Sequence, residues 1–193
     1  MQRGCGNSMK TRTLTAILVA GSVTAGAVAA GAAALAAGQS RDAQRRAQLA
    51  RLFPDADGFS PKEGSPPHFK VYADEPGSDE PRIVGYAFLT TDLEPLERGY
   101  DGPIQILVGM DPVGVLTGIV VGTHHEPYGY FSIDLPGYAA QFEAKSIRDR
   151  FRLGRDVDAV ATATLTVGSA TRAVKNSARR IARAFLTPPG ASR

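Results

Sequence analysis

The chain has 193 residues, of which 43% are hydrophobic and 21% charged, the composition of a soluble globular protein with one sizeable core. The formal net charge is +3, yet residues 39–165 are acidic overall and residues 166–187 hold five basic residues and no acid. A single basic helix is not the footprint that nucleic acid requires, so we expect no nucleic-acid partner. The lone cysteine, Cys5, excludes an internal disulfide, a cysteine-ligated zinc site and an iron–sulfur cluster, so redox activity requires a bound cofactor.

The first 38 residues have the pattern of a signal peptide or membrane anchor. Lys10 and Arg12 precede a run from Leu14 to Ala37 that has no charged residue. The run is long enough to span a bilayer, but its Ala, Gly and Val residues make it only weakly hydrophobic. Small residues near its end suit cleavage. A cleaved signal and a retained anchor both stay open, and both place the domain that follows on the extracytoplasmic (periplasmic) side.

Residues 39–66 are predicted to form a connecting helix, over 41–52, and a proline-rich loop. A domain is predicted over residues 67–188. Segments rich in Val, Ile, Tyr and Phe and bounded by turn residues predict strands over 69–73, 82–90, 104–110 and 115–124. The sequence Asp111-Pro-Val-Gly114 is typical of a hairpin turn, so the last two strands are expected to pair antiparallel. A short helix is predicted over 137–146.

The clearest predicted element is a C-terminal helix with Thr164 or Thr166 as its N-cap and Pro188-Pro189 at its end. Apolar residues recur along it at steps of three and four and predict one buried stripe: Val167, Ala170, Val174, Ala178, Ile181 and Phe185. The expected fold class is therefore α+β, a mostly antiparallel sheet with packed helices, preceded by an N-terminal signal or anchor helix.

Two segments carry residues suited to a site. Residues 122–129 (GTHHEPYG) follow the last predicted strand, and residues 158–166 (DAVATATLT) lead into the C-terminal helix. A helix N-terminus offers unpaired N–H groups to a phosphate, although threonines there are also ordinary caps. On a strand, His124 and Glu126 would share one face and His125 the other. One His and one Glu make an incomplete zinc set, so no metal site is predicted.

Six short motifs occur in one order along the chain: LFP at 52–54, GYAFLT at 85–90, GYDGP at 99–103, VGMD at 108–111, HHEP at 124–127 and ATLT at 163–166. Together they resemble the FMN-binding domain that begins the NosR/NirI-type nitrous-oxide and nitrite reductase regulators. A more distant resemblance is to the FMN-carrying subunits of the Rnf electron-transport complex and the sodium-pumping quinone reductase. The likeness covers roughly residues 50–186.

The resemblance implies FMN joined through its phosphate to a threonine, installed by a flavin transferase. The family pattern is Asp, two or three residues, Ser/Thr-Gly-Ala-Thr, any residue and Ser/Thr. Carried onto this chain, it makes Thr164 the acceptor, Asp158 the upstream acid and Thr166 the trailing hydroxyl. Ala161 stands at the Ser/Thr position and Thr162 at the glycine, where its bulk would slow attachment. Non-covalent FMN is the alternative.

The resemblance also implies which other residues lie at the flavin. Ala163 and Leu165 flank the acceptor and are expected to contact the cofactor. His125, Glu126 and Pro127 are expected near the flavin ring, where polar groups would tune its potential. A strand end followed by a proline turn is the alternative interpretation of that segment.

The predicted function is an extracytoplasmic electron-transfer flavoprotein domain that is no enzyme by itself. The expected partners are a flavin transferase, a membrane iron–sulfur or quinol-linked electron-transfer protein, and an extracytoplasmic reductase, with membrane contact through the N-terminal segment. The alternative is a maturation or regulatory binding module for a metalloreductase, without redox turnover of its own.

Overall fold

The computed structural model describes residues 24–75, 77–78 and 80–186. The chain forms two compact units, Met1–Arg41 and Asp42–Arg193. The charge-free run from residue 14 lies partly outside the described residues; from Thr24 onward it is helical, as the beginning of α1 (Thr24–Leu52). Within the described ranges, no helix combines the length and the apolar character needed to cross a membrane. The predicted end of the last helix at Pro188-Pro189 also lies outside these ranges.

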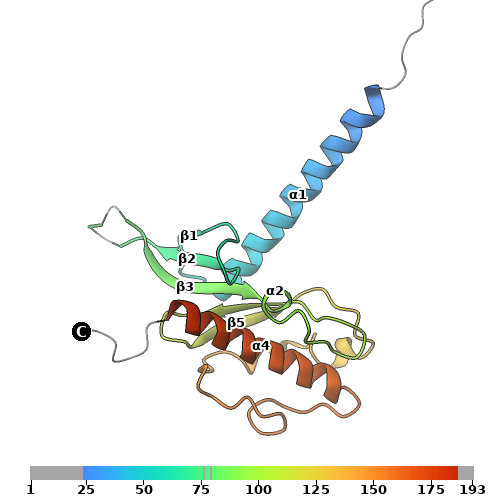
Figure 1. The fold of residues 1–193 in the computed structure, drawn as a ribbon, viewed down its shortest axis with the longest axis vertical. Coiled ribbons are helices and arrows are strands. Elements are labelled where there is room, and N and C mark those ends of the chain that lie inside the picture. Colours follow the sequence, from blue (N-terminus) through green and yellow to red (C-terminus); the bar gives the residue numbers. More distant parts are fainter. Residues whose placement is uncertain (1–23, 76, 79, 187–193) are drawn as a thin grey trace, which may run out of the picture. The chain divides into compact units, whose positions relative to one another are not determined.

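The second unit is built on a five-stranded sheet in which each strand pairs antiparallel with the next (Figure 1). The prediction of an α+β fold with a mostly antiparallel sheet is confirmed. The hairpin at Asp111 is confirmed too: the Asp111 carboxylate accepts the N–H groups of Val113 and Val115, at 2.9 and 2.8 Å. The strands are β1 (Gly58–Phe59), β2 (Phe69–Ala73), β3 (Arg82–Leu89), β4 (Ile106–Met110) and β5 (Leu116–Val121).

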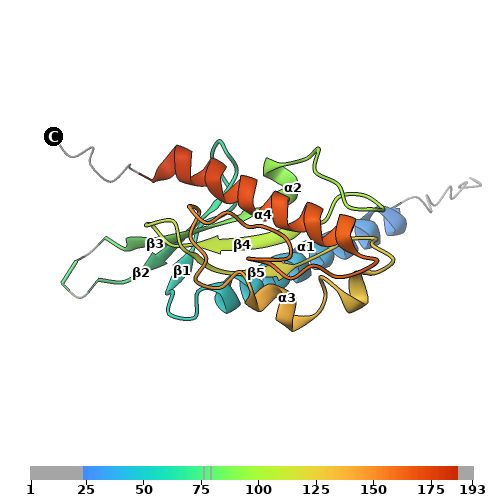
Figure 2. The same cartoon turned by 90° about the horizontal axis from the view of Figure 1, so that it is seen from below.

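The two faces of the sheet carry separate cores because side chains alternate along each strand. On β4, Ile106, Val108 and Met110 pack in the core that contains α4 (Thr164–Phe185). Leu107 packs on the opposite face with the end of α1, in a second core that includes Phe53. Figure 2 shows α4 lying along one face of the sheet. The apolar stripe predicted for this helix is confirmed, since five of its six residues are buried and Phe185 is half-buried.

Several predicted boundaries are wrong. The helix expected over 41–52 is the last part of the longer α1. The helix expected over 137–146 is the short α3 (Pro136–Ala140), and the chain beyond it turns through Ala144, whose φ of 59° no helix can accommodate. Three short elements were not predicted: the strand β1, the helix α2 (Thr90–Leu93) and the 3₁₀ helix η1 (Gly129–Phe131).

The early end of β5 matters most for the site. Pairing with the neighbouring strand continues past Val121 to the Thr123 carbonyl, which accepts the Gln105 N–H at 3.0 Å. Pro103, which precedes Gln105 by two residues, has no N–H to extend the ladder. The predicted strand over 115–124 is therefore too long. Residues 124–127 form a loop, so the alternation expected for His124, His125 and Glu126 does not apply.

Candidate functional site

The first turn of α4 presents backbone N–H groups beside an exposed threonine. Its N-cap residue is Ala163, with φ −111° and ψ 19°, and no side chain of the described residues caps it. The Val167 N–H donates to the Ala163 carbonyl at 2.9 Å, so the helical ladder begins only there. The N–H groups before it are those that a helix leaves without an internal partner. Thr164 is exposed, and its hydroxyl donates to the Val160 carbonyl at 3.3 Å.

The predicted N-cap is therefore wrong, although the helix does begin at Thr164. Both threonines lie inside the first turn, and neither hydroxyl accepts a helical N–H. Ala163 occupies the cap position and has no polar side chain to offer. The donors at this end of the helix are left for another acceptor, and an anion is the most favourable one because it also interacts with the helix dipole.

Thr162 has a strained backbone. Its φ is 69°, in the left-handed region where a side chain costs roughly 1–2 kcal/mol and which glycine adopts readily. This is the position at which the family pattern has glycine. The departure of this chain from that pattern thus falls at a backbone conformation that suits glycine better than threonine. Both Thr162 and Ala161 are exposed.

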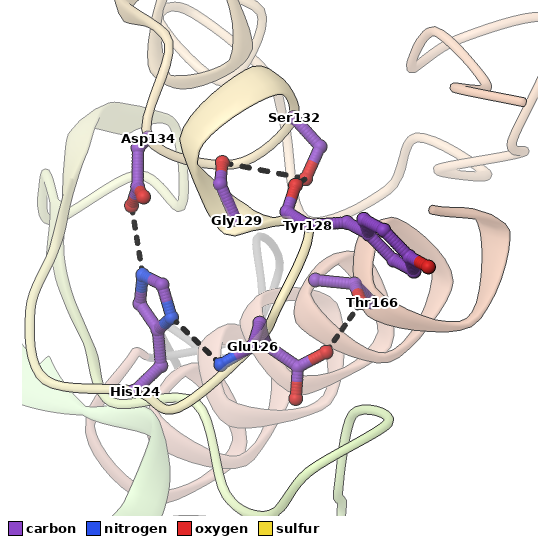
Figure 3. A network of polar contacts seen from close by, with 7 residues as sticks. All are labelled: His124, Glu126, Tyr128, Gly129, Ser132, Asp134 and Thr166. Atoms are coloured by element: carbon purple, nitrogen blue, oxygen red, sulfur yellow. Dashed lines mark hydrogen bonds and ion pairs between the residues drawn. The ribbon is translucent and has the colours of Figure 1, made fainter. Parts of the chain in front are cut away.

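A buried carboxylate fastens this turn to two loops. Glu126 is only 7% exposed, and its carboxylate accepts the N–H groups of Tyr100 and Asp101, both at 3.0 Å. It also accepts the hydroxyl of Thr166 (Figure 3). We call these four residues the Glu126 clamp. It joins the loop before β4, the loop after β5 and the first turn of α4, so the start of the helix has a defined position against both loops.

Gly99 makes room for the clamp. A Cβ atom placed on Gly99 would lie 2.3 Å from the Glu126 Oε1 atom, which no side-chain carbon can tolerate. Burial by itself raises the pKa of the Glu126 carboxyl. The hydrogen bonds from the Thr166 hydroxyl and from the N–H groups of Asp101 and Tyr100 outweigh it, and the pKa lies below the ordinary value. Glu126 is therefore ionised at neutral pH.

His124 supports the same loop from the other side. The Glu126 N–H donates to His124 Nδ1 at 3.2 Å, and His124 Nε2 lies 2.7 Å from the Asp134 carboxylate (Figure 3). Because Nδ1 accepts a hydrogen bond, the proton of the ring is assigned to Nε2, which donates to Asp134. Gly129 allows this contact, since a Cβ there would lie 2.4 Å from the His124 ring. His124 thus orients the loop that carries Glu126.

Large apolar side chains are exposed around the clamp. Tyr100, which belongs to the clamp, is 67% exposed. Leu165, which precedes the clamp residue Thr166, is 66% exposed. Tyr128, two residues after Glu126, is also exposed (Figure 3). Exposed apolar side chains gathered at one place, rather than scattered singly, indicate a binding surface.

The structure brings some of the predicted site residues together. Glu126 and Thr166 are in direct contact, and Ala163, Thr164 and Leu165 form the adjoining turn. His125 and Pro127 are exposed on either side of Glu126. Asp158 lies further out: it is exposed, and its N–H donates to the Gln141 side chain at 2.7 Å. In the part of the chain that the structure describes, no group of three or more His, Cys, Asp and Glu side chains is placed to hold a metal ion.

Sequence reasoning missed the third segment of the clamp. The GYDGP motif at 99–103 contributes to the resemblance, but no role was assigned to Gly99 or to the N–H groups of Tyr100 and Asp101. It also missed that this loop is fastened to α4 a second time, where Arg172 donates to the Glu97 carboxylate at 2.7 Å. A signal was present in the sequence: a glycine next to a turn, in a motif that recurs in the family.

Comparison with known proteins matches the same part of the chain. Residues 99–179 match the family described as FMN-binding domain, a range that begins at Gly99 and contains every residue of the clamp and of the segment 158–166 that leads into α4. This chain carries an FMN-binding domain. A second similarity, 28% identity over 147 residues, is to the regulatory protein NosR of Pseudomonas aeruginosa; it covers 71% of this chain and 20% of that protein. The chain therefore spans about a fifth of the curated relative that it matches, and the resemblance to FMN-binding domains of the NosR type is confirmed.

The residues at the start of α4 fit FMN. Backbone N–H groups that lack a helical partner would hold its phosphate, and the exposed side chains of Tyr100, Tyr128 and Leu165 would lie against its ring system. Aromatic and aliphatic side chains pack well against a flat ring.

Proposed function

We propose that this chain is an electron-carrier domain whose FMN is joined to Thr164 by a phosphodiester. The observation that carries the proposal is the first turn of α4, where an exposed hydroxyl stands beside N–H groups without a helical partner. A phosphate ester on Thr164 can accept those N–H groups, and its negative charge is stabilised by the helix N-terminus. FMN, when bound, takes up electrons and passes them on through its ring.

Attachment needs an activated donor and a flavin transferase. FAD is such a donor, because a phosphoanhydride joins its FMN half to AMP. The Thr164 oxygen forms a bond to the FMN phosphorus, the anhydride bond breaks, and AMP leaves with the electron pair. The hydroxyl proton goes to a base of the transferase, since the partner of this hydroxyl in the chain is the Val160 carbonyl, which is no base. The exposure of Thr162, Thr164 and Leu165 leaves the turn accessible to that enzyme.

The residues around the turn hold the attachment point and the ring. The Glu126 clamp keeps the first turn of α4 in one position, so an adduct on Thr164 starts from a defined place. Tyr100, Tyr128 and Leu165 offer apolar surface to the ring. His125, Glu126 and Pro127 bring polar groups and a rigid turn beside it, and these tune the potential of the flavin.

The location and the partners belong to the same proposal. The charge-free run after Lys10 and Arg12 supports an extracytoplasmic domain that is either exported or held at the membrane by this segment. Electrons come from a membrane iron–sulfur or quinol-linked protein and go to an extracytoplasmic reductase. The chain by itself is a carrier and no enzyme.

A second candidate function is a regulatory or maturation module for a metalloreductase, without redox turnover. Two observations favour it: the strained Thr162 stands where the family pattern has glycine, and the similar protein from Pseudomonas aeruginosa is a regulatory protein. If the strain prevents attachment, the domain works without covalent flavin. Purified protein that is yellow and can be reduced and reoxidised would favour the electron carrier.

The deciding experiment measures intact mass and visible absorbance of residues 39–193, exported together with a flavin transferase. Wild type should carry the mass of one FMN and absorb as a flavin, whereas Thr164→Ala should carry neither. Thr123→Ala removes another exposed threonine, on the loop after β5, and should load as wild type does. Flavin colour in both wild type and Thr164→Ala would mean non-covalent FMN, and colour in neither would favour the regulatory module.

A further inference from the structure

A basic concavity lies on the loop that precedes the attachment turn, residues 158–165. Residues 145–156, called the basic loop below, surround a cavity of about 500 Å³. This cavity is not part of the site proposed for FMN at the start of α4. Its lining consists of charged side chains of both signs, with the basic ones in excess: Lys145, Arg148, Arg150, Arg152 and Arg155, with Asp149 and Asp156.

The two acids of the basic loop are engaged by their own backbone. The Asp149 carboxylate accepts the Ser146 N–H, and the Asp156 carboxylate accepts the Arg152 N–H, both at 2.9 Å. None of the ion pairs among the described residues involves a basic side chain of this loop. Residues 39–165 contain 13 basic residues in all against 19 acids, so five of those 13 gather within eleven residues. The basic loop is therefore a local excess of positive charge in a segment, residues 39–165, that is acidic overall.

The basic loop is also firmly held. Arg179 of α4 donates to the carbonyl groups of Ile147 and Asp149, both at 2.8 Å. The Ile147 N–H donates to Gly114 at 2.9 Å, and the Lys145 carbonyl accepts the Leu116 N–H at 2.8 Å. A surface held in this way loses little conformational entropy when a partner binds.

The basic loop runs along α4 toward the attachment turn. Its early part is fastened at Arg179, in the second half of the helix. Further on, Leu153 lies against Gly168, since a Cβ there would be 3.8 Å from its side chain. Gly168 follows Thr164 by four residues, about 6 Å along a helix axis. The part of the basic loop near Leu153 is thus about one helical turn from the residue proposed to carry FMN, and the part near Ile147 and Asp149 lies beside Arg179, further along the helix.

We propose that the basic loop is the docking surface for an acidic redox protein that exchanges electrons with the flavin. The proposal rests on the proposed function. Arginine guanidinium groups pair well with surface carboxylates, and a polarised charge distribution steers an acidic partner into the productive orientation. A nucleotide fits less well because the lining has no aromatic or apolar side chain for a base. A flat anionic membrane fits less well because the surface is hollowed and a flat sheet of headgroups cannot enter it.

The test uses two forms of one acceptor, native cytochrome c, which is basic, and succinylated cytochrome c, which is acidic. The flavin-loaded domain is reduced, freed of reductant and mixed with either form, and haem reduction is followed by stopped-flow absorbance. Each reduced FMN gives up two electrons, and two haem irons go from ferric to ferrous. We compare wild type with Arg148→Glu/Arg150→Glu and with Arg46→Glu/Arg51→Glu. The last variant makes the same change in net charge on exposed residues of α1.

At low ionic strength, Arg148→Glu/Arg150→Glu should slow the reduction of succinylated cytochrome c by about tenfold or more, and added salt should remove most of the difference. The control variant should change the rate much less. Arg148→Gln/Arg150→Gln should fall between, which guards against a folding defect of the charge reversal. Equal slowing by both charge-reversal pairs would overturn the proposal, as would loss of FMN loading in the loop variant, which would assign the surface to the transferase.

Calorimetric binding of oxidised succinylated cytochrome c to the flavin-free domain separates the two proposals. The chain could take up no FMN and still bind the acceptor, with binding lost in Arg148→Glu/Arg150→Glu. That outcome would support the docking surface and contradict the proposal of an electron carrier. If the chain is loaded with FMN and its rate of electron transfer is unchanged by the loop substitutions, the electron carrier is supported and the docking surface is contradicted. Co-sedimentation with vesicles of phosphatidylglycerol and phosphatidylcholine that depends on the loop, without an effect on electron transfer, would make it a membrane contact and sink the proposal.

Discussion

The Glu126 clamp and the attachment turn, residues 158–165, lie side by side and are built in opposite ways. In the clamp, a buried carboxylate receives three hydrogen bonds, and Gly99 is packed directly against it. In the attachment turn, Thr162 has a strained backbone, Ala163 caps the helix without a polar side chain, and Thr164 is exposed. The polar groups of the clamp are hydrogen-bonded to one another, whereas the N–H groups at the start of α4 have no helical partner and are available to a ligand.

The difference shows how an open site can still be well positioned. A hydroxyl that another enzyme must modify has to be accessible, so its immediate neighbours cannot be buried around it. Residues behind the exposed turn must then fix the position of Thr164. Thr166, two residues further on, does so through its hydrogen bond to Glu126. We therefore expect changes in the clamp to lower stability and flavin loading together, and changes in the turn to affect loading with little effect on stability.

The largest effect is expected for Glu126→Ala. This change leaves the N–H groups of Tyr100 and Asp101 and the Thr166 hydroxyl without their acceptor. We expect the free energy of unfolding to fall by about 3 kcal/mol, because each unpaired buried group costs on the order of 1 kcal/mol or more. Urea denaturation measures it. Glu143→Ala, at an exposed glutamate, should change it by less than about 0.5 kcal/mol; similar losses in the two variants would remove the contrast between clamp and surface.

Gly99→Ala should come next. The new Cβ would lie 2.3 Å from Glu126 Oε1, so the clamp has to move, and we expect a loss of about 2 kcal/mol. Gly137→Ala is the matched control, since no atom lies within 4 Å of a Cβ there. Thermal unfolding followed by circular dichroism compares the two. If Gly99→Ala is as stable as Gly137→Ala, the close packing of Gly99 on Glu126 is not what holds the loop.

Acid should weaken the clamp in a way that depends on Glu126. Burial raises the pKa of this carboxyl, but its hydrogen bonds lower it below the ordinary 4.5, so the folded state holds a proton less readily than the unfolded state. The stabilisation is complete above pH 4.5 and is lost as the pH falls through the folded pKa. Urea denaturation from about pH 6 to about pH 3 should show a steeper loss for wild type than for Glu126→Gln. Parallel curves would mean that the titration of Glu126 does not contribute to the loss of stability in acid.

The smallest effect on stability is expected for Thr162→Gly. Relief of the strain at φ 69° favours the folded state by roughly 1–2 kcal/mol, and the added freedom of glycine in the unfolded chain offsets about 0.5–1 kcal/mol. The net gain should lie between about 0 and 1.5 kcal/mol. Loading by a flavin transferase, followed by mass spectrometry over time, should be faster than in wild type. Ala161→Gly changes the preceding residue, whose own backbone is not in the left-handed region, and should give neither gain.

Much of the scaffold could be predicted from local patterns. The range of β2 and the buried stripe of α4 followed from β-branched segments and from three- and four-residue spacing, since a strand or helix exposes its burial pattern in its own sequence. The attachment segment was found by resemblance rather than by periodicity. The division of the chain into residues 1–38, 39–66 and 67–188 stays a prediction.

The predictions failed where distant parts of the chain decide the outcome. The length of β5 depends on where its partner strand can still donate, and Pro103 ends that ladder. The N-cap of α4 was assigned to a threonine because threonine is a good cap, but the Thr166 hydroxyl is already bonded to Glu126. A local propensity gives way when a buried partner forms a stronger hydrogen bond.

By itself, then, the sequence determined the antiparallel α+β scaffold, the amphipathic last helix and the segment that carries Thr164, because each is written in residues close together along the chain. Only the tertiary structure decided that Glu126 meets Thr166 from 40 positions away, that Gly99 must lack a side chain, and that the basic loop runs along α4 toward the attachment turn. These contacts depend on how three loops are brought to one end of a helix, which no local pattern of residues encodes.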